Sequence, residues 1–155
     1  MNGHRQKQAC VIDTVVLHRA NQARLQQPGE TAQLRKRRLL LQDVGRGQWL
    51  LLVSPNVLIE YRGHLVRPLN DLVRSFLEYA TTPDSSESVV VNWRALSGNE
   101  RDLALRRCRF PAHDLRLLRT AYGYRSTIFS EEDRVVRTDA CIHRSFQVHL
   151  VDPTA

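Results

Sequence analysis

The stretch "ACVIDTVVLHRA" (residues 9 to 20) places one carboxylate, Asp13, inside an apolar run. Its segment "CVIDTVV" (10 to 16) is rich in β-branched residues and too short for a helix, so it predicts a buried strand. A buried carboxylate is unfavourable unless a cation, hydrogen-bond donors or a metal ion compensates it. Two interpretations of Asp13 are therefore open: it caps the next helix, or it belongs to a larger carboxylate site.

Apolar runs alternate with helical patterns along the rest of the chain. Further strands are predicted at 49–54, 88–93, 125–130 and 146–152. Helices are predicted within 30–47, 55–67, 68–80 and 111–123, from apolar spacing, proline starts and glycine stops. This alternation predicts an α/β protein, a three-layer α/β/α sandwich with a mostly parallel central sheet. Ligands of such sheets normally bind at the carboxyl ends of the strands.

Length and composition predict a single domain with a basic surface. The 155 residues (1–155) fit one domain, of which residues 1–8 form a polar N-terminal tail. No apolar run is long enough for a signal sequence or a membrane span. Cys10, Cys108 and Cys141 are widely spaced, so they are read as small apolar residues in a reducing compartment, and a cytoplasmic location is expected. The net charge is +7, and all basic residues except Lys7 and Lys36 are arginine. Arginine favours a polyanionic partner, but compositional bias would give the same enrichment.

Acidic residues recur where strands end or helices begin. Asp13 follows the first strand, Glu60 lies in the helix after the second, Asp114 lies in the helix opened by Pro111, and the "SEED" segment (130 to 133) follows the fourth strand. These positions can converge on one edge of an α/β sheet. Clustered carboxylates without local cations typically hold a hard divalent cation, so Mg²⁺ or Mn²⁺ is the expected cofactor.

Five blocks of the chain resemble the PIN-domain family of metal-dependent nucleases, which includes the VapC-type toxins of toxin–antitoxin pairs. These blocks cover nearly the whole chain and follow the order found in the family: "VIDTVVL" (11 to 17), "VSPNVLIEYRGHLVRP" (53 to 68), "HDLRLLRTA" (113 to 121), "STIFSEED" (126 to 133) and "FQVHLVDP" (146 to 153). The chain departs from the family at Val15, where an asparagine is usual. The fourth acid is Glu132 if Ser130 stands for the family's threonine, and Asp133 if the register shifts by one.

The resemblance implies a Mg²⁺-dependent endoribonuclease, in which one or two metal ions activate a water for phosphodiester hydrolysis. It implies that Asp13 and Asp114 ligate the metal directly and that Glu60 and Glu132 ligate directly or through water. Thr14 would cap the next helix, and Ser130 would position a carboxylate or a phosphate oxygen. RNA is the expected partner, with a small antitoxin protein and a second copy of the chain as further candidates. The alternative is a catalytically impaired PIN-like module that binds RNA or protein, which Val15 would permit.

Candidate RNA-binding residues are of two kinds. Arg35 and Arg38 belong to the run "RKRR" (35 to 38), which is equally well explained as a solvated helix face because four consecutive residues span a full turn. Arg116 and Arg119 share the helix of Asp114 and are favoured slightly.

Other motifs carry weaker interpretations. His113 and Asp114 spell the "HD" of an all-helical metal phosphohydrolase class, with His64 as an upstream ligand, but that class does not use the predicted strands. Cys141 and His143 lack the second pair that a zinc site needs. Trp49 and Trp93 lie at strand ends, where packing is favoured over base stacking.

Overall fold

The computed structural model describes residues 7–22, 31–82 and 87–155 and contains a five-stranded parallel sheet with the order β3-β2-β1-β4-β5. The strands are β1 (Ala9–Ile12), β2 (Leu50–Val53), β3 (Val89–Val91), β4 (Ser126–Phe129) and β5 (His149–Val151). Of the predicted tail, residues 1–6 lie outside the described residues. The predicted α/β class is confirmed.

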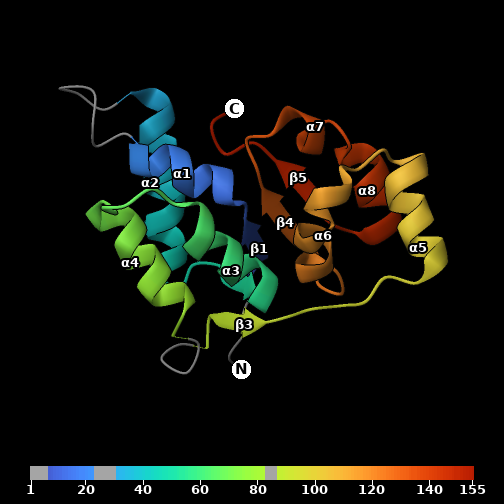
Figure 1. Cartoon of the computed structure of the whole chain (residues 1–155), viewed down its shortest axis with the longest axis horizontal. Helices are drawn as coiled ribbons and strands as arrows, with labels where there is room; N and C mark the ends of the chain where they lie inside the picture. Colours follow the sequence, from blue (N-terminus) through green and yellow to red (C-terminus); the bar gives the residue numbers. More distant parts are fainter. Residues whose placement is uncertain (1–6, 23–30, 83–86) are drawn as a thin grey trace, which may run out of the picture.

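Helices cover both faces of this sheet, as right-handed crossovers between parallel strands require. Figure 1 shows one group on one side of the sheet, at the left of the view: α1 (Thr14–Gln22), α2 (Ala32–Gly45), α3 (Pro55–His64) and α4 (Asp71–Ala80). The opposite face carries α5 (Gly98–Asp102), the π-helical turn η2 (Leu103–Arg107), the 3₁₀ turn η3 (Ala112–Asp114), α6 (Leu115–Ala121), α7 (Asp133–Val136) and α8 (Asp139–Phe146). The arrangement is a three-layer α/β/α sandwich.

Two predicted strands are wrong in their extent. The first strand ends at Ile12 rather than at residue 16, because Val16 N–H donates to the Asp13 carbonyl and begins α1. Val16 is apolar because it lies on the buried side of that helix. The last strand begins at His149 rather than at Phe146, which is the final residue of α8. Gln147 ends α8 with a φ of 58°.

The core forms where the apolar strands meet the inner helix faces. The three residues Val11, Leu52 and Ile128, one from each central strand, are fully buried. On α1, Leu17 and Ala20 are also fully buried, four and seven residues after Asp13. This packing fixes α1 against the sheet. It therefore also fixes the position of Asp13, which lies between β1 and α1.

The expectation for the cysteines is wrong for two of the three. Cys108 and Cys141 form a disulfide that joins the end of η2 to α8, whereas Cys10 is free and buried in β1. Sequence spacing could not reveal this pair, because the two residues meet only through the packing of α8 on η2. The prediction of a cytoplasmic location therefore loses the support that the cysteines gave it, since disulfides are typical of oxidising compartments. In the described part of the chain, no helix is long and apolar enough to cross a membrane.

Candidate functional site

The candidate site lies at the point where the strand order reverses. From β1 the chain moves toward β2 in one direction, and β4 lies on the other side of β1. In open parallel sheets, the crevice at such a switch point is the usual place for a ligand. Asp13 and Ser130 directly follow β1 and β4 here, so the sheet topology brings residues 117 positions apart into contact.

Residue Asp13 is 4% exposed, and its carboxylate is held by neighbouring groups. Ser130 Oγ donates to Asp13 Oδ2 at 2.7 Å and accepts from the Glu132 backbone N–H at 3.1 Å. Burial raises the pKa of Asp13 to about 6; the Ser130 hydroxyl lowers it, Asp114 and Glu60 raise it, and the Val15 backbone N–H lowers it. Both interpretations of Asp13 thus hold in part, because it lies at the start of α1 and also faces other acids.

Four carboxylates line one pocket, which we call the acidic pocket and which has a volume of about 350 Å³. They are Asp13, Glu60, Asp114 and Glu132, the four acids named from the sequence. Asp133, the alternative fourth acid, is not among the lining residues. The remaining lining residues are Thr14, Val15, His18, His64, His113, Arg116 and Arg134.

Asp114 reaches the acidic pocket from the start of α6. It occupies the position before this helix, but its side chain makes no capping hydrogen bond. Burial raises its pKa, nearby His113 and Arg116 lower it, and Glu132 raises it. The His113 Nε2 atom lies 3.4 Å from Asp114 Oδ2. Because no helix N–H is capped by this carboxylate, its position is better explained by a role in the pocket than by helix capping.

Glu60 is already paired with a cation. Arg116 Nε lies 2.7 Å from Glu60 Oε2, although neither atom makes a well-aligned hydrogen bond. A buried hydrogen bond between Ser54 and Thr120 (2.8 Å) fixes α3, which carries Glu60, against α6, which carries Arg116. Thr120 donates to the Arg116 carbonyl, so Ser54 is the donor in that bond. The expected RNA-binding role of Arg116 therefore competes with this ion pair.

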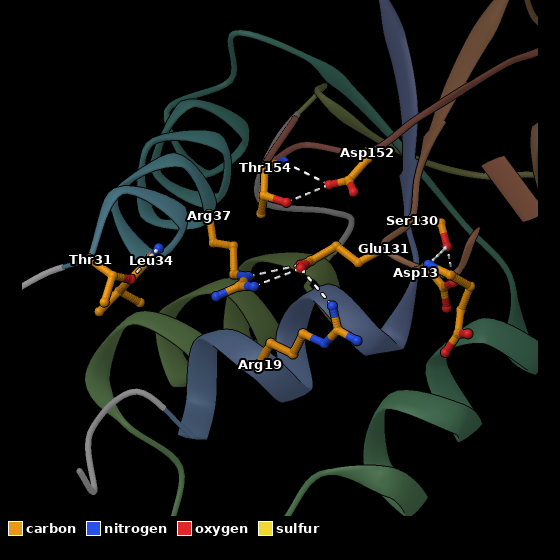
Figure 2. Close-up of polar contacts among 10 residues, drawn as sticks. Asp13, Arg19, Thr31, Leu34, Arg37, Ser130, Glu131, Asp152 and Thr154 are labelled. Atoms are coloured by element: carbon orange, nitrogen blue, oxygen red, sulfur yellow. Dashed lines mark hydrogen bonds and ion pairs between the residues drawn. The ribbon is translucent and has the colours of Figure 1, made fainter. Parts of the chain in front are cut away.

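Glu131 has a structural role that the sequence analysis missed. Its side chain is 1% exposed and accepts from Arg37 Nε (2.8 Å), Arg37 Nη2 (2.7 Å) and Arg19 Nη1 (3.0 Å). Figure 2 shows this side chain directed toward α1 and α2, away from Asp13 and Ser130. The bidentate pair with Arg37 ties α2, and the single bond from Arg19 ties α1, to the residue that follows Ser130. One arginine of the "RKRR" run is thus structural.

The arginine candidates are distributed over separate places. Arg35 and Arg38 lie on α2 and do not line the acidic pocket. Arg38 Nη1 lies 3.4 Å from Gln42 Oε1. Arg119 lines a neighbouring pocket, where its guanidinium stacks on the ring of Trp93 at 3.9 Å. Of the four arginine candidates, Arg116 alone lines the acidic pocket, whose other arginine is Arg134 of α7.

The chemistry of the donor set fits a hard divalent cation. Carboxylate oxygens are the ligands that Mg²⁺ prefers, and the Thr14 hydroxyl in the acidic pocket is buried without a hydrogen-bond partner among the described residues. The expected capping role of Thr14 is not seen, since this oxygen accepts no backbone N–H. In the part of the chain that the structure describes, no three His, Cys, Asp or Glu side chains approach closely enough to hold a metal ion together.

Comparison of the chain with known protein families, with curated proteins and with solved structures finds no match. The fold and the site define the class on their own: a three-layer α/β/α protein with an acidic pocket at the switch point of a parallel sheet. The observed sheet is incompatible with the all-helical "HD" class, although His64 and His113 do line the pocket.

Proposed function

We propose that the protein is a Mg²⁺- or Mn²⁺-dependent endoribonuclease that hydrolyses phosphodiester bonds in the acidic pocket. The observation that carries this proposal is the convergence of Asp13, Glu60, Asp114 and Glu132, from four separate segments, on one pocket. Such convergence of like charges raises the free energy of the metal-free protein, and a divalent cation would offset it. The resemblance to PIN-domain nucleases agrees with it, and the role as a toxin with a small antitoxin stays a prediction.

Each pocket residue has a distinct task in this proposal. Asp13 and Asp114 would hold the metal, with Glu60 and Glu132 as further ligands directly or through water. When bound, the metal supplies an activated water and charge neutralisation at the scissile phosphate. Ser130 keeps the Asp13 carboxylate in one orientation through its hydrogen bond. Arg116 holds Glu60 and lies where a phosphate entering the acidic pocket would meet it.

A second candidate function is a catalytically impaired module that binds RNA or protein. It is favoured by Val15, an apolar residue lining the acidic pocket where the PIN family has a polar one. It is also favoured by the Glu60–Arg116 ion pair, which occupies one carboxylate with a cation of the protein itself.

A cleavage assay on mixed RNA, with Mg²⁺ or Mn²⁺ and with a chelator, tests the proposal. The native protein should cleave only with metal, and Asp13→Asn should lower the rate by more than roughly a hundredfold, because losing even an outer partner of a metal site costs about 10- to 100-fold. Glu132→Gln should also impair cleavage, whereas Asp133→Asn, an equal change of charge outside the pocket, should not. Equal rates with metal and with chelator would exclude the metal mechanism. Absence of cleavage by the native protein would favour the binding module.

Metal binding can be measured separately from catalysis. A cation that binds only the folded state raises the melting temperature, so Mg²⁺ or Mn²⁺ should stabilise the native protein. Asp13→Asn and Asp114→Asn should lose this stabilisation, while Asp133→Asn should retain it. A metal effect of the same size in all four proteins would place the ion elsewhere.

A further inference from the structure

A second pocket, of about 400 Å³, adjoins the acidic pocket, and we call it the Trp93 pocket. The two pockets share His113 and Arg116, so they are continuous along one side of α6. Trp93, Arg101 and Arg119 also line the Trp93 pocket, and no Asp or Glu is among the described residues that do. The Trp93 pocket is therefore positively charged, whereas four carboxylates line the acidic pocket.

The backbone around Trp93 is fixed on both sides. Asn92 N–H donates to the Val53 carbonyl at 2.8 Å and so extends the pairing of β2 with β3. The Asn92 amide donates to the carbonyls of Thr120 (2.8 Å) and Tyr122 (3.0 Å) at the end of α6. Although its position is fixed, the Trp93 residue is 37% exposed. An aromatic ring that is both fixed and exposed is pre-organised for a stacking partner.

Arg119 is fixed on this ring without losing its charge. Its backbone carbonyl accepts from Arg94 N–H at 3.0 Å, and its Nε donates to the Arg94 carbonyl at 3.1 Å. Within the described ranges, neither Arg119 nor Arg101 has a carboxylate at ion-pair distance, in contrast to Arg116, Arg19 and Arg37. Two uncompensated guanidinium groups beside an exposed indole form a site for phosphate and base together.

We propose that the Trp93 pocket binds a single-stranded segment of RNA, with one base stacked at Trp93 and the flanking phosphates at Arg101 and Arg119. The strand would continue over His113 and Arg116 into the acidic pocket. This inference rests on the proposed function, because it names the form of the substrate: an unpaired stretch beside the bond that is cleaved. Base stacking on an aromatic ring requires a base that is free of its own stack, which a duplex does not offer.

Binding is measured with a fluorescein-labelled single-stranded RNA in the presence of a chelator, so that cleavage cannot contribute. Trp93→Ala should weaken binding roughly tenfold, the usual effect of removing one stacking ring, and Trp93→Phe should weaken it much less. Arg119→Gln should also weaken binding. Arg74→Gln, the same change of charge on α4, is the matched control and should have little effect.

Intrinsic fluorescence separates a stacking role from a structural one. The chain has two tryptophans, and Trp49 packs edge-on against Phe129 with ring centroids 5.3 Å apart. RNA should quench the native protein and Trp49→Phe, because Trp93 remains in both. In Trp93→Phe the quenching should disappear while most of the binding remains.

Three results would overturn the inference: affinity in Trp93→Ala equal to native, equal losses in Arg119→Gln and Arg74→Gln, or tighter binding to duplex RNA than to the single strand. If the protein is not a nuclease, the same experiments give a different result. In that case Trp93-dependent binding persists, and no RNA is cleaved after metal is added.

Discussion

At the residue scale, the buried Asp13 carboxylate shows how an unfavourable group is retained. Its pKa is raised to about 6 from an ordinary value of 3.8, so the folded protein binds a proton more tightly than the unfolded chain. Its contribution to stability is therefore complete below about pH 4 and is lost as the pH rises through about 6. At neutral pH the ionised group destabilises the fold, which is expected of a group retained for function rather than for stability.

Asp13→Asn should raise the free energy of unfolding by roughly 1–2 kcal/mol at pH 7 without metal, because the amide oxygen can still accept from Ser130 and carries no charge. Stability should also depend less on pH between about 4 and 7. Some dependence should remain, since the pKa of Asp114 is raised as well. Thermal melts at several pH values, with Glu78→Gln on α4 as the control, measure both effects. A variant less stable than the native protein at pH 7 would instead make Asp13 a structural residue.

At the element scale, the side chains of the neighbouring residues Glu131 and Glu132 point to opposite sides of the segment that follows β4. Glu131 pairs with arginines from α1 and α2, whereas Glu132 faces the acidic pocket. The alternation arises because the chain leaves β4 in an extended form, so successive side chains point to opposite sides. A single segment thus connects the helical layer to the candidate site.

Glu131→Gln should lower the free energy of unfolding by about 3 kcal/mol, because it leaves Arg37, whose side chain is 14% exposed, without its carboxylate. The half-exposed Arg19 contributes less. Glu132→Gln, the same substitution one residue later, should leave stability unchanged or raise it by relieving repulsion from Asp114. Urea unfolding of the two variants gives the comparison. Similar values for both would mean that the ion pairs of Glu131 contribute no net stability.

At the scale of the whole molecule, the disulfide Cys108–Cys141 closes a segment with a sequence separation of 33 residues, which contains η3, α6, β4 and α7. Closing a loop of this size reduces the entropy of the unfolded chain and stabilises the fold by about 3–4 kcal/mol in the chain-entropy description. The same segment carries Asp114, Ser130 and Glu132. The bond therefore constrains the part of the chain that supplies two of the four carboxylates of the acidic pocket.

Reduction of this bond should lower the melting temperature of the native protein. The double variant Cys108→Ser/Cys141→Ser should melt at the lower temperature with or without reductant, while Cys10→Ala should remain sensitive to it. Melting curves with and without a thiol reductant provide the measurement. A native melting temperature that does not respond to complete reduction would contradict the stabilising role.

The sequence by itself determined the order of the five strands, the helices α2, α3, α4 and α6, and the acids Asp13, Glu60 and Asp114 of the acidic pocket. Apolar runs and capping residues are local signals, and in a parallel α/β sheet the carboxyl ends of all strands meet at one edge. Only the tertiary structure decided the end of β1 at Ile12, the disulfide, the ion pairs of Glu131 and Glu60, and the exposure of Trp93. Each of these depends on which distant segments pack together, and no local pattern in the chain encodes that packing. The choice of Glu132 over Asp133 is of the same kind, because a shift of one residue reverses the side to which a side chain points.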